Sequence, residues 1–406
     1  TAFGSGALDA CTGANYNTAF GRNALGENTA SGNTAFGREC MGLNVSGTEN
    51  TAVGNGALGA AAGHYNSALG SGALAATTGS GNTGVGRTAL GSNTGGAQNT
   101  GIGGNALSTN ISGGWNVAVG YSALGANTAS NNVAIGGSAA TANTGGDSNV
   151  AVGFQALAAN TDSDDNVAIG KDALATVTVG AAPHFGGLTA IGYEAGKAVT
   201  TGHESVFVGY GAGKAKTVNN QVCYVGYKAG HIETGLWGNT FIGAYAGANC
   251  SAGNGMTFIG NGAGYNNAGA YNDAFGYRAL YTNTGGIGNC ALGGYALQYY
   301  NGVSGADHYN TAVGYNAFSD NYSVVNRCTG VGYGVSISAS GTDDENVFGY
   351  DVTGSSNTFT FGTGTTDTRC TNGGTSWSNP SDARYKENVE DQTAGLSFVN
   401  DLRPVT

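Results

Sequence analysis

Three lysines in this Gly-rich chain directly follow a glycine, an arrangement that phosphate-binding loops use. They are found in the pairs Gly170-Lys171, Gly196-Lys197 and Gly213-Lys214. In a phosphate-binding loop the lysine is followed by Ser or Thr, whose hydroxyl binds the magnesium ion. None of these three lysines has Ser or Thr after it. The sequence therefore does not predict a nucleotide site.

The other groups that could bind a metal or hydrolyse a bond are scattered. The five histidines are isolated and lack metal-ligand spacing; they are His64, His184, His203, His231 and His308. Acidic clusters at 162–165 and 343–345 lack the spacing of calcium-binding β-helix repeats, which favours solvated loop charge. Asp and Glu are too sparse to predict the paired carboxylates of a glycosidase. We expect no metal, no cofactor and no enzymatic turnover.

Tyrosines recur at a regular interval in the second half of the chain. They are Tyr193, Tyr210, Tyr227, Tyr277, Tyr315, Tyr333 and Tyr350. Stacked tyrosine rings offer sugars an apolar face with a polar tip, and the alternative is a structural stack that stiffens the fold. Two long insertions add His184 and Phe185, and then Tyr299, Tyr300, Asp307, His308 and Tyr309. The candidate binding residues are Tyr193, Tyr210, Tyr227, Tyr299, Tyr300 and Tyr309.

The tyrosines follow the rhythm of an internal repeat that organises the whole chain. The phrase Asn-Thr-Ala-Val-Gly, with Phe, Ile or Leu in place of Val, recurs 22 times between Gly4 and Gly362. Most spacings between the closing glycines are 16 or 17 residues, and the steps into Gly192 and Gly314 are longer. One such unit cannot bury its apolar residue alone, but stacked units share a continuous core. The repeat predicts an all-β fold, a parallel β-solenoid or β-roll of about 16–17-residue rungs.

Each rung should present two different strand faces, because side chains alternate along a strand. The residue before the glycine is large and apolar, as in Val53 and Ile102, and we expect it to fill the core. The opposite face carries small residues such as Ala118, which would let another backbone approach closely. Asn recurs four residues before the glycine in ten consecutive rungs, from Asn17 to Asn166. These amides are predicted to stack as a hydrogen-bonded ladder.

Composition excludes several classes of protein. The chain has 406 residues, of which 76 are Gly and only 3 are Pro, and its net charge is −11. A net negative charge disfavours nucleic acid and anionic membrane surfaces as partners, and no apolar run is long enough to insert into a membrane. Cys40, Cys223 and Cys290 are interpreted as small core residues. The chain opens at Thr1 in mid-motif, so we expect a portion of a longer protein.

A thin rod with a small-residue face predicts self-association, as a parallel homotrimer. The phrases Asn116-Val117-Ala118-Val119-Gly120 and Asn132-Val133-Ala134-Ile135-Gly136 resemble the Asn-Ser-Val-Ala-Ile-Gly repeats of trimeric autotransporter adhesin heads. That resemblance implies a trimer of left-handed parallel β-rolls. It covers the strand phrase only, because the repeat of those heads is shorter.

The C-terminal composition changes after a Thr/Ser/Gly-rich neck. Ser381-Asp382-Ala383-Arg384-Tyr385-Lys386-Glu387-Asn388 is followed by Leu402-Arg403-Pro404-Val405. This pattern resembles the opening of the endosialidase-type intramolecular chaperone domain that ends phage tail fibres and tailspikes. The resemblance implies trimerisation, assisted folding of the preceding stalk and a single self-cleavage by a Ser–Lys dyad, which falls on Ser381 and Lys386. The alternative role for Ser381 is a helix cap.

The sequence thus predicts three segments: a solenoid shaft at 1–349, a β neck at 350–380 and the start of a chaperone domain at 381–406. The expected function is that of an extracellular or virion-borne fibre, a phage tail fibre that attaches to a host-surface glycan or receptor. The alternatives are a bacterial trimeric adhesin or extracellular structural filament, and a glycan-degrading tailspike.

Overall fold

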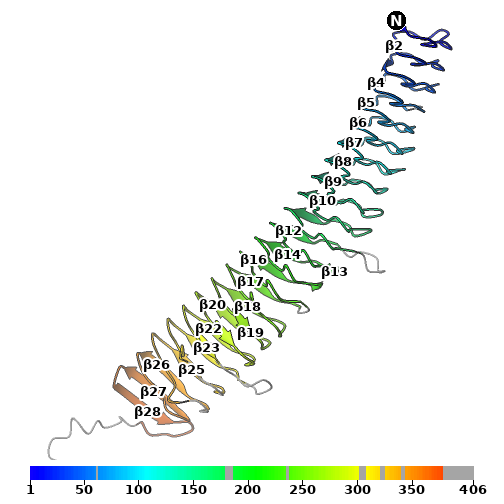
Figure 1. Cartoon of the computed structure of the whole chain (residues 1–406). Coiled ribbons are helices and arrows are strands. Elements are labelled where there is room, and N and C mark those ends of the chain that lie inside the picture. The colour runs from blue at the N-terminus through cyan, green and yellow to red at the C-terminus, as the bar shows by residue number, and fades with distance from the viewer. Residues whose placement is uncertain are drawn as a thin grey trace, which may run out of the picture.

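The computed structural model shows a long, gently curved rod made of stacked rungs, with the N-terminus at one end and the C-terminal strands at the other (Figure 1). It describes residues 1–60, 63–178, 186–234, 237–300, 308–320, 325–339 and 343–377. These residues form strands, turns and bends, and none of them is helical. The predicted all-β parallel solenoid of roughly 17-residue rungs is confirmed.

One 23-stranded sheet runs the length of the rod. Its strands are β1 (Ala2–Phe3), β2 (Thr18–Phe20), β3 (Thr34–Phe36), β4 (Thr51–Val53), β5 (Ser67–Leu69), β6 (Thr83–Val85), β7 (Thr100–Ile102), β8 (Val117–Val119), β9 (Val133–Ile135), β10 (Val150–Val152), β11 (Val167–Ile169), β12 (Thr189–Ile191), β14 (Val206–Val208), β16 (Cys223–Val225), β17 (Thr240–Ile242), β18 (Thr257–Ile259), β20 (Asp273–Phe275), β22 (Cys290–Leu292), β24 (Thr311–Val313), β25 (Thr329–Val331), β26 (Asn346–Tyr350), β27 (Thr358–Thr363) and β28 (Thr366–Thr371).

Two small parallel sheets lie elsewhere on the rungs. They contain β13 (Thr201–His203) with β15 (Val218–Asn220), and β19 (Asn266–Asn267), β21 (Thr282–Asn283) and β23 (Tyr299–Tyr300).

The register of the long sheet follows the repeat. In β2 and β3, for example, Ala19 pairs with Ala35 and Phe20 pairs with Phe36. Equivalent repeat positions therefore stack directly above one another, and the period of the sequence is the height of one rung. Only β28 runs antiparallel, where it forms a hairpin with β27.

The repeat glycine is required where each strand turns into the return segment of its rung. Gly120 has a φ of +136°, and a Cβ placed on it would lie 2.5 Å from the carbonyl oxygen of Gly136 in the next rung. No side chain fits into that space, and an L-residue rarely adopts that φ. The same contact recurs along the stack, which explains why glycine closes the phrase.

The face of the long sheet that the sequence analysis predicted to be buried is exposed, and the face predicted to be exposed is buried. The central residue of each strand, which is small in most of them, is buried, as at Ala19 and Ala52, whereas the large residue before the glycine points outward, as at Phe20 and Val53. We call this outward surface, made by the first and third residues of each strand, the outer sheet face. The small residues thus face the interior of their own chain and offer no surface to a second chain.

The core is filled from the return segment, where an Ala-Leu pair follows the repeat glycine. Leu58, Leu74 and Leu124 are fully buried against the alanines of the strands. In β14, β16, β17 and β18 the large side chain comes from the strand instead of from the return segment. The strands there carry the buried rings of Phe207, Tyr224, Phe241 and Phe258, and the return positions carry glycine. The narrow space between the two layers thus receives about one large side chain per rung.

Buried asparagines stabilise the turns. The predicted ladder from Asn17 to Asn166 is confirmed: each side-chain oxygen accepts a bond of 2.8–3.0 Å from the backbone N–H of the next asparagine. A second ladder, which the sequence analysis did not predict, runs beside it. There Asn143 donates to Asn127 and Asn160 donates to Asn143, both at 2.8 Å.

The predicted neck continues the sheet, because β27 pairs in parallel with β26 and matches Gly362 to Gly349. The predicted chaperone segment at 381–406 lies outside the described residues, and so do His184, Phe185 and Asp307 of the two insertions. Within the described part of the chain, there is no helix long and apolar enough to cross a membrane.

Candidate functional site: a tyrosine track along the rod

A track of tyrosine rings begins at the corner that follows β12. Tyr193 and Tyr210 stack with their ring centroids 4.9 Å apart at an interplanar angle of 19°, and Tyr210 and Tyr227 stack at 5.4 Å and 25°. The parallel register of β12, β14 and β16 causes this stacking, because equivalent positions of successive rungs lie in line. Tyr227 then meets Tyr245 edge to face at 5.1 Å. The predicted stack of Tyr193, Tyr210 and Tyr227 is therefore present.

The track continues to the neck in a second run. Tyr277, Tyr295 and Tyr315 meet edge to face at 5.2 and 5.5 Å. Tyr315, Tyr333 and Tyr350 then stack at 5.7 and 5.0 Å.

Arg278 joins the two runs. Its guanidinium carbon lies 5.4 Å from the ring centroid of Tyr277 and 5.1 Å from that of Tyr281. Tyr281 stacks on Tyr265 at 5.0 Å, and Tyr265 meets Tyr245 at 6.2 Å. The result is one aromatic track that spans nine rung steps, about 43 Å at about 4.8 Å per step. Tyr245, Tyr265, Tyr281 and Tyr295 were missed by the sequence analysis, because they stand two or five residues after the glycine instead of one.

The rings of the track are accessible from solvent. Tyr210, Tyr227, Tyr315 and Tyr333 keep between 42% and 48% of their surface exposed. Desolvation among the neighbouring rings raises the pKa of Tyr245, and contact with Tyr227 raises it further. The phenol therefore stays neutral at ordinary pH. A neutral tyrosine offers a ligand an apolar face together with a hydroxyl that donates and accepts hydrogen bonds.

Cations lie beside the first rings. The amino nitrogens of Lys171 and Lys228 lie 5.6 Å and 5.4 Å from the ring centroids of Tyr193 and Tyr227. Glu194 binds Lys197 at 2.7 Å and Lys214 at 2.6 Å. The hydrogen bonds from these two lysines lower the pKa of Glu194 to about 2. This end of the track therefore combines aromatic rings with a compensated charge cluster.

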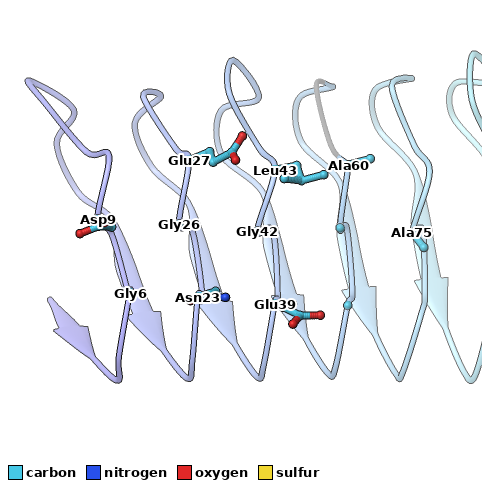
Figure 2. Close-up of a pocket in the computed structure, with 12 residues that line it drawn as sticks. Gly6, Asp9, Asn23, Gly26, Glu27, Glu39, Gly42, Leu43, Ala60 and Ala75 are labelled. Atoms are coloured by element: carbon cyan, nitrogen blue, oxygen red, sulfur yellow. The ribbon is translucent and has the colours of Figure 1, made fainter.

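The return side of the rungs also carries a shallow groove near the N-terminus, of about 660 Å3 (Figure 2). Small residues such as Gly26 and Gly42 form its floor, while Glu27 and Glu39 lie along it. The groove occupies repeat positions two, five and six after the glycine, and positions two and five carry Tyr245 and Tyr265 later in the chain. Glu39 is paired with Arg22 at 3.0 Å and with Arg38 at 3.4 Å, so its charge is compensated.

The insertion tyrosines are separated by the fold. Tyr299 and Tyr309 are exposed, but Tyr300 is buried, with only 1% of its surface accessible. The Tyr300 hydroxyl donates to the backbone oxygen of Val325 at 2.9 Å and bonds the ring of His308, which is also buried. Tyr300 is therefore a core residue, and the prediction that it forms part of a binding surface is wrong.

The carboxylates of the acidic clusters bind backbone N–H groups and neighbouring side chains. Asp164 accepts a bond from the backbone of Asp147 at 2.8 Å, and Asp344 pairs with Arg327 at 2.8 Å. Glu345 is buried and accepts bonds from Ser338. The described part of the chain contains no group of three or more His, Cys, Asp or Glu side chains that could hold a metal ion.

One ionic group is enclosed in the core. Lys216 and Glu233 are fully buried and lie 2.8 Å apart, and the Tyr224 hydroxyl donates to the same Glu233 carboxylate at 2.8 Å. Desolvation lowers the pKa of Lys216, and it raises the pKa of Tyr224 well above its usual value. No ligand can reach this group from outside the rod without opening a rung, so its role is structural.

The predicted self-cleavage residues Ser381 and Lys386 lie outside the described residues. Comparisons of the chain with protein-family models, with curated proteins and with solved structures give no match.

Proposed function

We propose that this chain is the shaft of an extracellular attachment fibre, a phage tail fibre, which binds a host-surface glycan through its tyrosine track. The observation that carries the proposal is the track of partly exposed rings between Tyr193 and Tyr350, whose neighbouring centroids lie 4.9–6.2 Å apart within two runs that Arg278 joins. Sugar rings bind through their apolar C–H faces, and exposed tyrosine rings match them in size and polarity.

The shape of the molecule suits this task. Twenty-two parallel strands give 21 rung steps, or a rod of about 100 Å at about 4.8 Å per step. Such a rod holds its binding surface away from the particle that carries it. The repeated rings also give many equivalent weak contacts, and linked weak contacts raise the overall affinity without any new interaction.

The proposed assembly is a homotrimer, and the proposed location is the virion or another extracellular surface. The Ser381–Asn388 resemblance supports the phage origin, because that pattern opens the chaperone of tail fibres. The alternative is a bacterial trimeric adhesin or extracellular structural filament, which the likeness of the strand phrases to adhesin heads supports.

Tyrosine substitution tests glycan binding. Tyr210→Ala combined with Tyr227→Ala should lower binding to isolated host-surface polysaccharide at least tenfold, which corresponds to about 1.4 kcal/mol. The matched control combines Tyr65→Ala with Tyr121→Ala, since these rings are 63% and 65% exposed and lie outside the track. Equal losses in the two variants, or an unchanged affinity in the track variant, would refute the proposed site.

Mass measurement tests the phage-fibre proposal separately. We expect the chain expressed from its full gene to end near Ser381 after self-cleavage, and the Ser381→Ala version to remain uncut. An uncut native chain, which differs in mass from Ser381→Ala only by the hydroxyl oxygen, would contradict the self-cleaving chaperone and make the C-terminal segment a permanent cap. This result would leave the glycan measurement unaffected, because the track lies between Tyr193 and Tyr350.

A further inference from the structure

The outer sheet face is an apolar surface that nothing in the single chain covers. The residue before each repeat glycine, from Phe3 in β1 to Phe361 in β27, points outward and is Phe, Val, Leu or Ile. Phe3, Phe20 and Phe36 stack on one another at 4.7 and 4.5 Å while remaining 42–65% exposed. Large apolar side chains therefore lie in an unbroken column on the outside of the rod.

The size of this face, with its apolar and Thr positions taken together, is that of a protein interface. Three residues of about 3.3 Å across and a rung height of about 4.8 Å give about 48 Å2 per rung, hence about 1,000 Å2 over the 22 parallel strands. A standard protein interface buries about 800 Å2 on each partner. The area is therefore sufficient for a stable interface.

The low charge of this face and the parallel type of the sheet also indicate that a partner covers it. Among the outward positions of the strands β1 to β27, Asp273 is the one charged residue. The other outward residues that accompany the large ones are mostly Thr and Val. A partner must consequently be largely apolar and carry little charge along this face. Parallel sheets are in addition normally covered on both faces.

We infer that the outer sheet face is covered by the same face of two further copies of this chain, parallel and in register, around an axis along the rod. This inference rests on the fibre proposed above and assigns its interface. A copy of the chain is the partner whose apolar face has the required length and lack of charge. The arrangement replaces the small-residue face that the sequence analysis had expected to mediate association.

Rotational symmetry about the rod axis fixes the register, because every residue then lies at the same height as its own copies. Each outward phenylalanine then contacts the same phenylalanine of the other copies, and each outward Val or Ile contacts the same Val or Ile. The return side of each rung, which carries the tyrosine track, faces away from the axis and stays open to ligands.

Two native cysteines report on this arrangement. Cys223 in β16 and Cys290 in β22 occupy outward positions and are partly exposed free thiols, so the prediction that they are core residues is wrong. Four rung steps separate them, which is about 19 Å at about 4.8 Å per step. In register, Cys223 lies near Cys223 of the other copies, and Cys290 lies near Cys290.

The first experiment treats the native full-length protein with a short bismaleimide and maps the links by mass spectrometry. We expect links between chains from Cys223 to Cys223 and from Cys290 to Cys290, and their loss in Cys223→Ser and Cys290→Ser. Links from Cys223 to Cys290 would overturn the register. A trimer without any link at either cysteine would overturn the assigned face while leaving the trimer itself intact.

The second experiment measures mass by light scattering. The native protein should have three times the mass that its own chain shows under denaturing conditions. Ile102→Arg, Ile135→Arg and Ile169→Arg, combined on the outer sheet face, should reduce it to a single chain with an unchanged β-type circular dichroism spectrum. The control places arginine at Leu43, Ile111 and Ile232, which lie off this face and are 47–57% exposed, against 37–42% for the three outer-face residues.

The outcomes separate the interface from glycan binding. A native monomer, or dissociation by the control and not by the outer-face variant, would overturn the inference. If the face variant does not fold, the cysteine links in the native protein decide. Failure of the tyrosine variants to lower glycan affinity would refute the binding proposal and leave the links unchanged.

Discussion

The ring of Phe241 occupies the space that a side chain at Gly247 would need. A Cβ built on Gly247 would lie 2.5 Å from a ring carbon of Phe241. Where the strand carries alanine instead, as at Ala168, the corresponding return position carries Leu174. The two positions face one another across the thin core and share one large side chain between them.

This complementarity predicts a strong coupling between the two residues. Phe241→Ala alone should destabilise the protein by about 3–5 kcal/mol through an unfilled cavity, and Gly247→Leu alone by about 1–3 kcal/mol through overpacking. The double variant should recover much of the loss, because Gly247 has a φ of +56° and Leu174 already adopts +48°. A double-mutant cycle of urea unfolding measures the coupling, and additive losses would argue against the shared space.

The repeat glycine should tolerate no side chain. Gly120→Ala places a methyl group 2.5 Å from the oxygen of Gly136, so we expect loss of the cooperative unfolding transition or a Tm lower by more than 10 °C. Gly56→Asn is the matched control, because a Cβ at Gly56 meets nothing within 4 Å and Asn23 has a similar φ at the equivalent position. A normal transition in Gly120→Ala would show that the rungs separate more easily than the structure indicates.

The asparagine ladder predicts that removal of one asparagine exposes a nearby backbone amide to hydrogen exchange. Asn116 accepts a bond from the Asn132 backbone at 2.9 Å and donates to Asn99 and to the Ala129 oxygen. Asn116→Ala removes the acceptor of the buried Asn132 N–H, at a cost of about 1–3 kcal/mol, whereas the Asn99 oxygen keeps the Asn116 backbone N–H and the Ala129 oxygen keeps the Asn127 amide. Hydrogen exchange should accelerate at the Asn132 amide first. Unchanged exchange there would mean that water replaces the amide.

The Glu194 cluster predicts an acid-sensitive stretch near β12. The pKa of Glu194 falls from its usual 4.5 to about 2 because Lys197 and Lys214 bind the ionised carboxylate. A depressed folded-state pKa contributes stability above the unfolded value, and this contribution is lost as pH falls from about 4.5 to 2. Glu194→Gln should flatten the Tm profile across this window. A wild-type Tm that does not change across this pH window would contradict the stabilising role of Glu194.

The enclosed Lys216–Glu233 pair predicts that a single substitution lowers the free energy of unfolding, whereas a combined substitution leaves it unchanged or raises it. Glu233→Leu alone strands a buried ammonium and should cost about 3–5 kcal/mol. Lys216→Met, Glu233→Leu and Tyr224→Phe together remove the buried ion pair and the hydroxyl that binds it, and Phe207, Phe241 and Phe258 already occupy the same column. The triple variant should therefore unfold near or above the wild-type midpoint in urea. A triple variant weaker than Glu233→Leu would show that the ion pair is needed for the register.

The sequence alone determined the fold class, the rung period, the register and the first asparagine ladder. Each follows from spacing along the chain, because parallel stacking of equal units places equal residues in line. The stack at Tyr193, Tyr210 and Tyr227 was predictable for the same reason. It was the tertiary structure that decided which strand face is inside. Alternation shows that the faces differ, but the thin space between two hydrogen-bonded layers admits one large side chain per rung, and Leu58 and its equivalents supply it from the return segment. The large residues of the strands, such as Phe20, are therefore left outside, and the Phe241–Gly247 exchange obeys the same limit on volume.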